Sequence, residues 1–253
     1  MSTSDRLLAI LDLFTLDRPD WAVEEAAAAL GIATSTVYRY FNSLSRIGLL
    51  TALGSGRHGL GPTVIRYDRQ LRRTDPLVLA AGSELDRLAR LLPGRSVAFL
   101  CRLFGDQVIC VAQVAIADPP FALGYERGRP MPLFAGSASR VILSHLDPRR
   151  LRALYRREPA SFAKAGLGDD WEPVRAALRV QRDAGGCISS GEVDAGMRGV
   201  SAAVVAAGVL GSVTVAGPRS ALTEAAARRL LSEVVDAARA VERGLGRIAE
   251  RRR

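Results

Sequence analysis

The chain is poor in the side chains on which much enzyme chemistry depends. Its 253 residues contain one lysine, Lys164, and two histidines, His58 and His145. Because a P-loop and a Schiff base both need a lysine, these mechanisms are excluded unless Lys164 itself supplies that side chain. Two histidines in unrelated contexts, with no HExxH motif, argue against a catalytic metal. His145 also lacks the spacing to Ser139 or Ser144 that a catalytic triad or nucleophile elbow has. We expect a protein that is not an enzyme and needs no metal or cofactor.

Cysteines and long apolar runs are also scarce. The three cysteines, Cys101, Cys110 and Cys187, form no CxxC pair. They support neither a zinc module nor a disulfide framework, and we expect them to be buried small apolar residues. No apolar run approaches the roughly 18 residues of a membrane helix. The start of the chain lacks the basic end, unbroken apolar core and cleavage site of a signal peptide. We expect a cytoplasmic protein with no membrane partner.

Positive charge, by contrast, is in excess and unevenly distributed. The formal net charge is +9. Residues 1–38 contain two arginines against six acids, a net of −4, whereas residues 39–73 contain seven arginines against one acid, a net of +6. Such a reversal is typical of a surface that approaches a phosphate backbone. The alternative is chance clustering in an arginine-rich chain.

The stretch 22–50 has the pattern of a helix, a tight turn and a second helix. Apolar residues recur at i, i+4 and i+7 in each half: Val23, Ala27 and Leu30, then Val37, Phe41 and Leu44. This spacing buries one stripe of each helix and leaves the other face free. Gly31 lies between them, where a sharp reversal favours a residue that tolerates positive φ.

The free face of the second helix carries hydrogen-bonding side chains. They are Thr34, Ser35, Thr36, Tyr38, Arg39 and Asn42. A helical face of this size and chemistry suits the major groove, so we predict that it contacts DNA, with Arg39 as the principal contact. The alternatives are a surface ion pair for Arg39 and packing of Tyr38 against the preceding helix.

A glycine-rich hairpin is expected after these helices. Residues 49–53 are predicted as a strand, residues 54–59 as the hairpin tip, and residues 60–64 as the returning strand. Arg57 and His58 would lie at the tip, beside phosphate or in the minor groove, unless the tip is only a solvated turn. With an amphipathic helix predicted at 4–16, these elements form a winged helix-turn-helix DNA-binding domain over residues 1–61.

The rest of the chain is predicted to form a linker and a second domain. Residues 62–74 are expected to be a basic linker helix, which Asp75-Pro76 ends. In residues 75–253 we predict helices at 77–92, 137–146, from Pro148, at 171–184 and at 221–248. Strands are predicted at 96–103, 107–115, 187–193, 200–206 and 209–216. This order favours an α+β domain with a mostly antiparallel sheet.

Three motifs are spread over nearly the whole length of the chain. The first is LGIATSTVYRYFNSLSRIG at residues 30–48, and the second is PLFAGSASRVILSHL at residues 132–146. The third spans residues 186–218, with GE near its start and GP at its end. With these motifs the chain resembles the IclR-type bacterial transcription regulators, whose patterns for the first two are LGxxxSTVxRxLxxLxxxG and pLxxtAxGkalLaxL. The chain departs from these patterns at Ser139-Arg140, where the family has Gly-Lys, and at Ala203, where it has Pro.

The resemblance implies a GAF-like effector domain whose curved sheet cups a small organic acid or aromatic compound. By position, the candidate effector-binding residues are Ser137, Ala138, Ser189, Gly199, Thr214 and Ala216. The backbone N–H groups of Ser137 and Ala138 would suit a carboxylate, because a helix start offers unpaired donors. Since Gly199 and Ala216 are small and apolar, we expect a larger or more apolar ligand than in relatives with more polar pockets.

We therefore predict a transcriptional regulator whose binding to a double-stranded DNA operator changes with a small-molecule effector. A homo-oligomer, dimer or tetramer, would place two recognition helices in successive major grooves about 34 Å apart. The alternative is a winged-helix DNA-binding or protein-contact module without a ligand.

Overall fold

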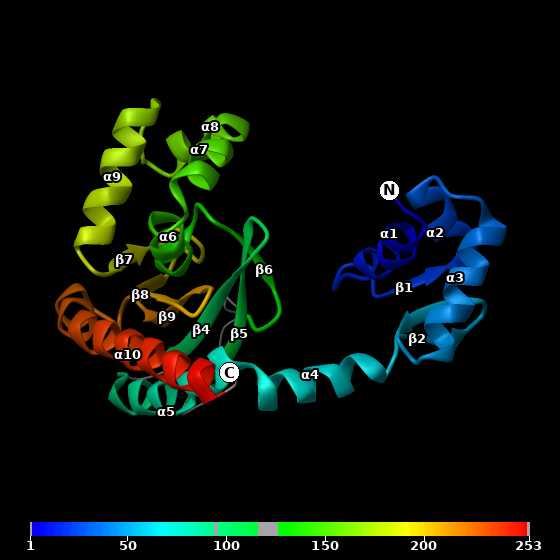
Figure 1. Cartoon of the computed structure of the whole chain (residues 1–253), viewed down its shortest axis with the longest axis horizontal. Coiled ribbons are helices and arrows are strands. Elements are labelled where there is room, and N and C mark those ends of the chain that lie inside the picture. The colour runs from blue at the N-terminus through cyan, green and yellow to red at the C-terminus, as the bar shows by residue number, and fades with distance from the viewer. Residues whose placement is uncertain (1, 94–95, 116–125, 252–253) are drawn as a thin grey trace. The chain divides into compact units, whose positions relative to one another are not determined.

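The chain folds as two compact units, Met1–Thr74 and Asp75–Arg253. A computed structural model describes residues 2–93, 96–115 and 126–251 (Figure 1). Within these ranges, no helix has both the length and the apolar character needed to cross a membrane.

The first unit is a winged helix-turn-helix followed by one further helix. Its elements are α1 (Thr3–Leu8), a 3-10 helix (Leu11–Leu13), β1 (Asp20–Ala22), α2 (Val23–Leu30), α3 (Thr34–Arg46), β2 (Leu50–Gly54), β3 (Arg57–Leu60) and α4 (Thr63–Thr74). The strands form an antiparallel sheet in the order β1-β3-β2.

The predicted apolar stripes form the core of this unit. The buried residues include Val23, Ala27, Val37, Phe41 and Leu44, together with Ile10 and Trp21. Gly31 follows α2 with φ +62°, a left-handed conformation that lets the chain turn sharply into α3. The stripe of α3 is therefore fixed inward and its opposite face is left toward solvent.

This unit differs from the sequence prediction in three details. The helix predicted at 4–16 is interrupted after Leu8, where the chain turns and brings Ile10, which is fully buried, into the core. Strand β1 was not predicted, because its three residues gain their pairing only from β3. The hairpin tip is shorter than expected: Ser55 and Gly56, with φ of +50° and +74°, form a two-residue turn that fits the twist of a hairpin.

The second unit is a six-stranded antiparallel sheet with helices on both faces. Its elements are α5 (Pro76–Leu91), β4 (Val97–Phe104), β5 (Gln107–Ala115), β6 (Pro130–Pro132), α6 (Gly136–Ser144), α7 (Pro148–Arg157), α8 (Pro159–Lys164), α9 (Trp171–Asp183), β7 (Cys187–Ser190), β8 (Met197–Ala206), β9 (Val209–Pro218) and α10 (Glu224–Arg251). The strand order is β6-β5-β4-β9-β8-β7.

Alternating side chains give this sheet two apolar faces, as strand geometry requires. On β4, Ala98 and Leu100 pack with the residues of α5 and α10. Val97 and Phe99 point the other way and pack with residues of α6, α7, α8 and α9. Figure 1 shows these helices on the side of the sheet opposite α5 and α10. The predicted α+β class, with a winged helix-turn-helix and a mostly antiparallel sheet, is confirmed. Helix α8 was not predicted.

Candidate functional site

Six of the predicted DNA contacts lie on α3. Thr34, Ser35, Tyr38, Arg39 and Asn42 are exposed and Thr36 is half-buried. Tyr38 is 59% exposed, so it does not pack into the core. Arg39 has no ion-pair partner among the described residues. No side chain caps the first turn of α3, so its free N–H groups can donate to an anion.

Arg57 and His58 do not lie at the hairpin tip, where the sequence placed them. Both belong to β3. The Arg57 guanidinium donates to Asp20 in β1 and, at 3.3 Å, to Glu25 in α2, which also pairs with Arg18 at 2.8 Å. This cluster ties the first sheet to the start of α2.

His58 is part of the same packed region. Its ring meets the buried Phe41 edge-on, with 5.1 Å between the ring centroids. The tip position predicted for both residues was therefore wrong. The charge partners of Arg57 lie 37 and 32 residues away in sequence, too far for local spacing to reveal them.

The cluster changes the acidity of Glu25. Hydrogen bonds from Arg57, from the backbone N–H of Ala22 and from Arg18 stabilise the ionised carboxylate and lower its pKa to about 2. Glu25 therefore remains charged over the ordinary pH range and pairs with both arginines.

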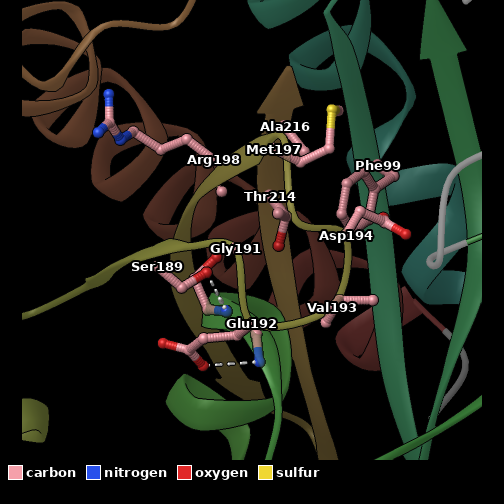
Figure 2. A pocket seen from close by; sticks show the side chains of 13 residues that line it. Phe99, Ser189, Gly191, Glu192, Val193, Asp194, Met197, Arg198, Thr214 and Ala216 are labelled. Atoms are coloured by element: carbon pink, nitrogen blue, oxygen red, sulfur yellow. Dashed lines mark hydrogen bonds between the residues drawn. The ribbon is translucent and has the colours of Figure 1, made fainter. Parts of the chain in front are cut away.

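A pocket in the second unit lies where α6 begins above strands β7, β8 and β9. Strand register explains which residues meet there: Ser189 pairs with Gly199, and Gly199 pairs with Ala216. These three positions form one row across the sheet. Thr214 belongs to the next row on the same face, opposite Phe99. Figure 2 shows these side chains around the pocket.

Buried hydroxyl groups form a continuous network at this pocket. Ser201 Oγ donates to Ser137 Oγ at 2.8 Å and lies 2.8 Å from Thr214 Oγ1. Ser189 Oγ accepts from the backbone N–H of Ser137 at 2.9 Å. Sequence reasoning missed Ser201, which is fully buried and is placed there by its register with Thr214.

An acidic side chain occupies the start of α6. Glu192, in the segment between β7 and β8, accepts the N–H of Gly136 through Oε2 at 3.0 Å. The same oxygen lies 3.2 Å from Arg140 Nε. The two dashed hydrogen bonds in Figure 2 are those of Glu192 and Ser189. Of the two donors expected to be open for a ligand carboxylate, the N–H of Ser137 is therefore already bonded to Ser189, and Glu192 holds the neighbouring N–H of Gly136.

Five of the six predicted effector contacts line this pocket: Ser137, Ser189, Gly199, Thr214 and Ala216. Ala138 does not; its side chain is fully buried in the core below α6. Residues of the segment 191–194 and Phe99, Met197 and Arg198 complete the lining. The cavity holds about 40 Å³, which is room for a few waters.

Gly199 contributes space rather than a contact. A Cβ at this position would lie 2.6 Å from Ser137 Oγ and 3.4 Å from Ser189 Oγ. A side chain at this position would therefore require the Ser137 hydroxyl to shift, so the glycine leaves room for that hydroxyl at the start of α6.

The described residues contain no group of three or more His, Cys, Asp or Glu side chains that could hold a metal ion. Cys101 and Cys110 are buried. Burial raises the pKa of the Cys187 thiol to about 11, which keeps it protonated and unreactive.

Comparison with known proteins gives matches to both units. Residues 3–54 match the model of the IclR helix-turn-helix domain, and residues 71–243 match the model described as bacterial transcriptional regulator IclR C-terminal. The Pca regulon regulatory protein of Pseudomonas putida is 23% identical over 207 residues, which are 82% of this chain and 70% of that protein.

Two solved structures share the fold over almost the entire chain. An IclR transcriptional regulator from Alicyclobacillus acidocaldarius has a TM-score of 0.75 at 21% identity, covering 96% of this chain and 98% of that one. An IclR homolog from Microbacterium hydrocarbonoxydans, complexed with 4-hydroxybenzoate, has a TM-score of 0.74 at 20% identity, covering 96% and 99%.

Glu25 predicts a pH dependence for the stability of the first unit. Because its folded-state pKa lies below its ordinary value, its contribution is complete above about pH 4.5 and is lost as the pH falls toward about 2. Glu25→Gln should lower the thermal midpoint at pH 6, followed by circular dichroism, and the difference from wild type should shrink at pH 3. Glu24→Gln, an adjacent exposed acid, is the control and should have little effect. A deficit in Glu25→Gln that is equally large at both pH values would contradict this role.

Proposed function

The chain belongs to the IclR family of bacterial transcriptional regulators, with a helix-turn-helix DNA-binding domain and an IclR effector domain. From this premise, we propose that it binds an operator as a homo-oligomer through the exposed face of α3. We further propose that a small organic acid in the pocket at the start of α6 modulates this binding. The effector proposal rests on one observation: at this pocket, buried hydroxyl groups lie beside the backbone N–H donors at the start of a helix.

For DNA, the proposed contacts are the polar residues of α3. Arg39 has an exposed guanidinium without an ion-pair partner in the described chain, so it is available to read a guanine edge. The uncapped first turn, at Thr34 and Ser35, would bind a phosphate. Contact of Arg57 or His58 with phosphate stays a prediction. Since the operator is bacterial DNA, we assign the protein to the cytoplasm.

For the effector, the pocket combines apolar and hydroxyl surfaces. Phe99, Met197 and Ala216 suit an apolar or aromatic body, and Ser189 and Thr214 suit its polar groups. The 4-hydroxybenzoate bound by the Microbacterium relative is a ligand of this kind and serves as a first probe. An aromatic acid needs far more than 40 Å³, so the segment 191–196 has to move when it binds.

The charges around the pocket indicate how an acid would enter. Arg198 lines the pocket, but its guanidinium points away (Figure 2) and donates to Ser190 Oγ and the Leu222 carbonyl. The cation near the start of α6 is Arg140, a residue of the same helix, and it already pairs with Glu192. We therefore propose that a ligand carboxylate exchanges with the carboxylate of Glu192, accepting the Gly136 N–H in its place. Only the arrangement with this segment displaced would bind the acid, which is the differential affinity that a switch needs.

For assembly, α4 offers an apolar stripe. Val64, Tyr67 and Leu71 lie at i, i+3 and i+7 and are 37%, 44% and 58% exposed within the chain. Apolar side chains in one stripe of an otherwise basic helix are typical of a helix–helix contact. We propose that this stripe pairs with α4 of a second copy, which would set the spacing of the two DNA-binding units.

Arg39→Ala should weaken specific operator binding by about 1–3 kcal/mol, because it removes a bidentate contact to a base. Fluorescence anisotropy with a labelled operator fragment measures the loss. Arg39→Lys keeps the positive charge but loses the bidentate geometry of the guanidinium. If Arg39 reads a base, this variant should therefore recover little of the sequence specificity that Arg39→Ala loses. An affinity for the operator that Arg39→Ala leaves unchanged would refute the role.

Glu192→Gln should bind 4-hydroxybenzoate about fivefold more tightly than wild type, because a neutral amide at a helix start is displaced roughly 1 kcal/mol more easily than a carboxylate. Calorimetry with the full-length protein measures this. The neutral isostere 4-hydroxybenzamide should bind both forms more weakly than the acid, because it has no carboxylate to replace that of Glu192.

Asp194→Asn is the matched control, since it removes an acid from the same segment but leaves Glu192, the acceptor of the Gly136 N–H, unchanged. An equal gain in affinity in both variants would mean that the loss of any negative charge near the pocket is enough, and that the position of Glu192 at the helix start does not matter. Weaker binding in Glu192→Gln would mean that Glu192 helps to hold the ligand. Failure of a panel of aromatic and aliphatic acids to bind either form would reject the effector proposal itself.

Leu71→Glu should shift the protein toward monomer, because it places a charge in the proposed α4 contact. Gln70→Glu, an exposed neighbour on the same helix, should keep the wild-type mass. Analytical ultracentrifugation at low micromolar concentration tests both. A Leu71→Glu variant with the wild-type mass would place the contact elsewhere.

A further inference from the structure

A second and larger cavity lies in the effector unit, away from the pocket at the start of α6. It has a volume of about 340 Å³ and lies between the end of α6, the start of α7 and one face of α9. A volume of this size is within the range of small-molecule sites. These helices cover the face of the sheet opposite α5 and α10 (Figure 1).

The rim of this cavity is strongly basic. Trp171, Arg175, Arg179 and Arg182 follow one another at i, i+4, i+8 and i+11, so one stripe of α9 faces the cavity. Among the residues that the structure describes, the lining contains three guanidinium groups and no carboxylate. Like charges four residues apart destabilise a helix by a few tenths of a kcal/mol, a cost that a bound anion would offset.

These arginines are free to contact a ligand. Arg175 meets Glu172 at 3.2 Å and Arg179 meets Asp183 at 3.9 Å, but all four side chains are 63–75% exposed. Exposed pairs of this kind contribute about 0–1 kcal/mol. The Arg182 guanidinium has no ion-pair partner in the described part of the chain. None of the three is committed to a structural contact.

The floor of the cavity is apolar. Leu146, Leu151 and Leu178 form it, each less than 8% exposed. Trp171 closes one end, where its ring packs against Tyr155 with 5.5 Å between the centroids. The start of α7 is not available to an anion, since Asp147 already caps it by accepting the N–H groups of Arg149 and Arg150. An anion in this cavity would therefore be held by α9.

We propose that this cavity is a second ligand site, which takes a small organic anion with an apolar body. The body lies on the leucine floor beside Trp171, and the acidic group meets the arginines of α9. The alternative is that the aliphatic parts of the arginine side chains only cover the core, while their guanidinium groups remain in water.

Anilinonaphthalene sulfonate, added to the full-length protein, is the probe, because it combines aromatic rings with one sulfonate. The double variant Arg175→Gln/Arg179→Gln should bind it at least about tenfold more weakly than wild type. The matched control is Arg239→Gln/Arg228→Gln on α10, whose arginines form exposed i,i+3 and i,i+4 ion pairs of the same kind. The control should stay within about twofold of wild type. Equal losses in the two double variants would overturn the proposal.

Two further measurements test the location and the ligand class. Energy transfer from tryptophan to the bound probe should be largely lost in Trp171→Phe, and transfer that persists would put the probe elsewhere. The uncharged analogue phenylnaphthylamine should bind wild type about tenfold more weakly than the sulfonate. Equal binding of the two compounds would overturn the assignment to an anion. Circular dichroism of each variant excludes unfolding as the cause of a loss.

Discussion

The close approach of α6 to strand β8 at Gly199 is the constraint on which the effector unit depends. With no side chain at this position, the helix start lies against the sheet, and Ser137 reaches Ser201, which reaches Thr214. A Cβ there would lie 2.6 Å from Ser137 Oγ, a separation that real contacts essentially never show. The absent side chain thus leaves room for the Ser137 hydroxyl, and with it for the hydroxyl network that joins Ser137, Ser201 and Thr214 beside the pocket.

This approach buries the start of a helix, and a buried helix start leaves N–H donors that need acceptors. Ser189 and Glu192 provide them, which is why the segment after β7 closes over the pocket. A ligand with its own carboxylate can replace the Glu192 oxygen without leaving a donor unsatisfied, whereas a purely apolar ligand cannot. The same physics that closes the pocket therefore favours acids as the compounds that open it.

Local sequence patterns predicted what depends on local periodicity, and failed where partners are distant. Val37, Phe41 and Leu44 were assigned to the core correctly, because a helical stripe is visible in the sequence itself. Arg57 was misplaced because its partners, Asp20 and Glu25, come from other elements. The family resemblance located Ser189, Gly199 and Ala216, which strand register then aligned in one row. The family resemblance did not indicate Ser201, whose position follows from the pairing of β8 with β9. It also did not indicate that the side chain of Ala138 points into the core.

Helix α6 links the two proposed ligand sites. Gly136 and Ser137 at its start line the closed pocket, and Ser144 at its end lines the larger basic cavity. Nine residues of α-helix span only about 13 Å and move as a rigid element. The two ends differ in chemistry: at the start, Glu192 must be displaced, while at the far end the arginines of α9 are already open. An anion bound at the far end that shifts α6 along its axis would alter the hydrogen bond between Gly136 and Glu192. Because an acid has to replace Glu192 in the first pocket, its affinity for that pocket would change as well. Because such coupling is reciprocal, an acid in the first pocket would change the affinity of the second site by the same factor.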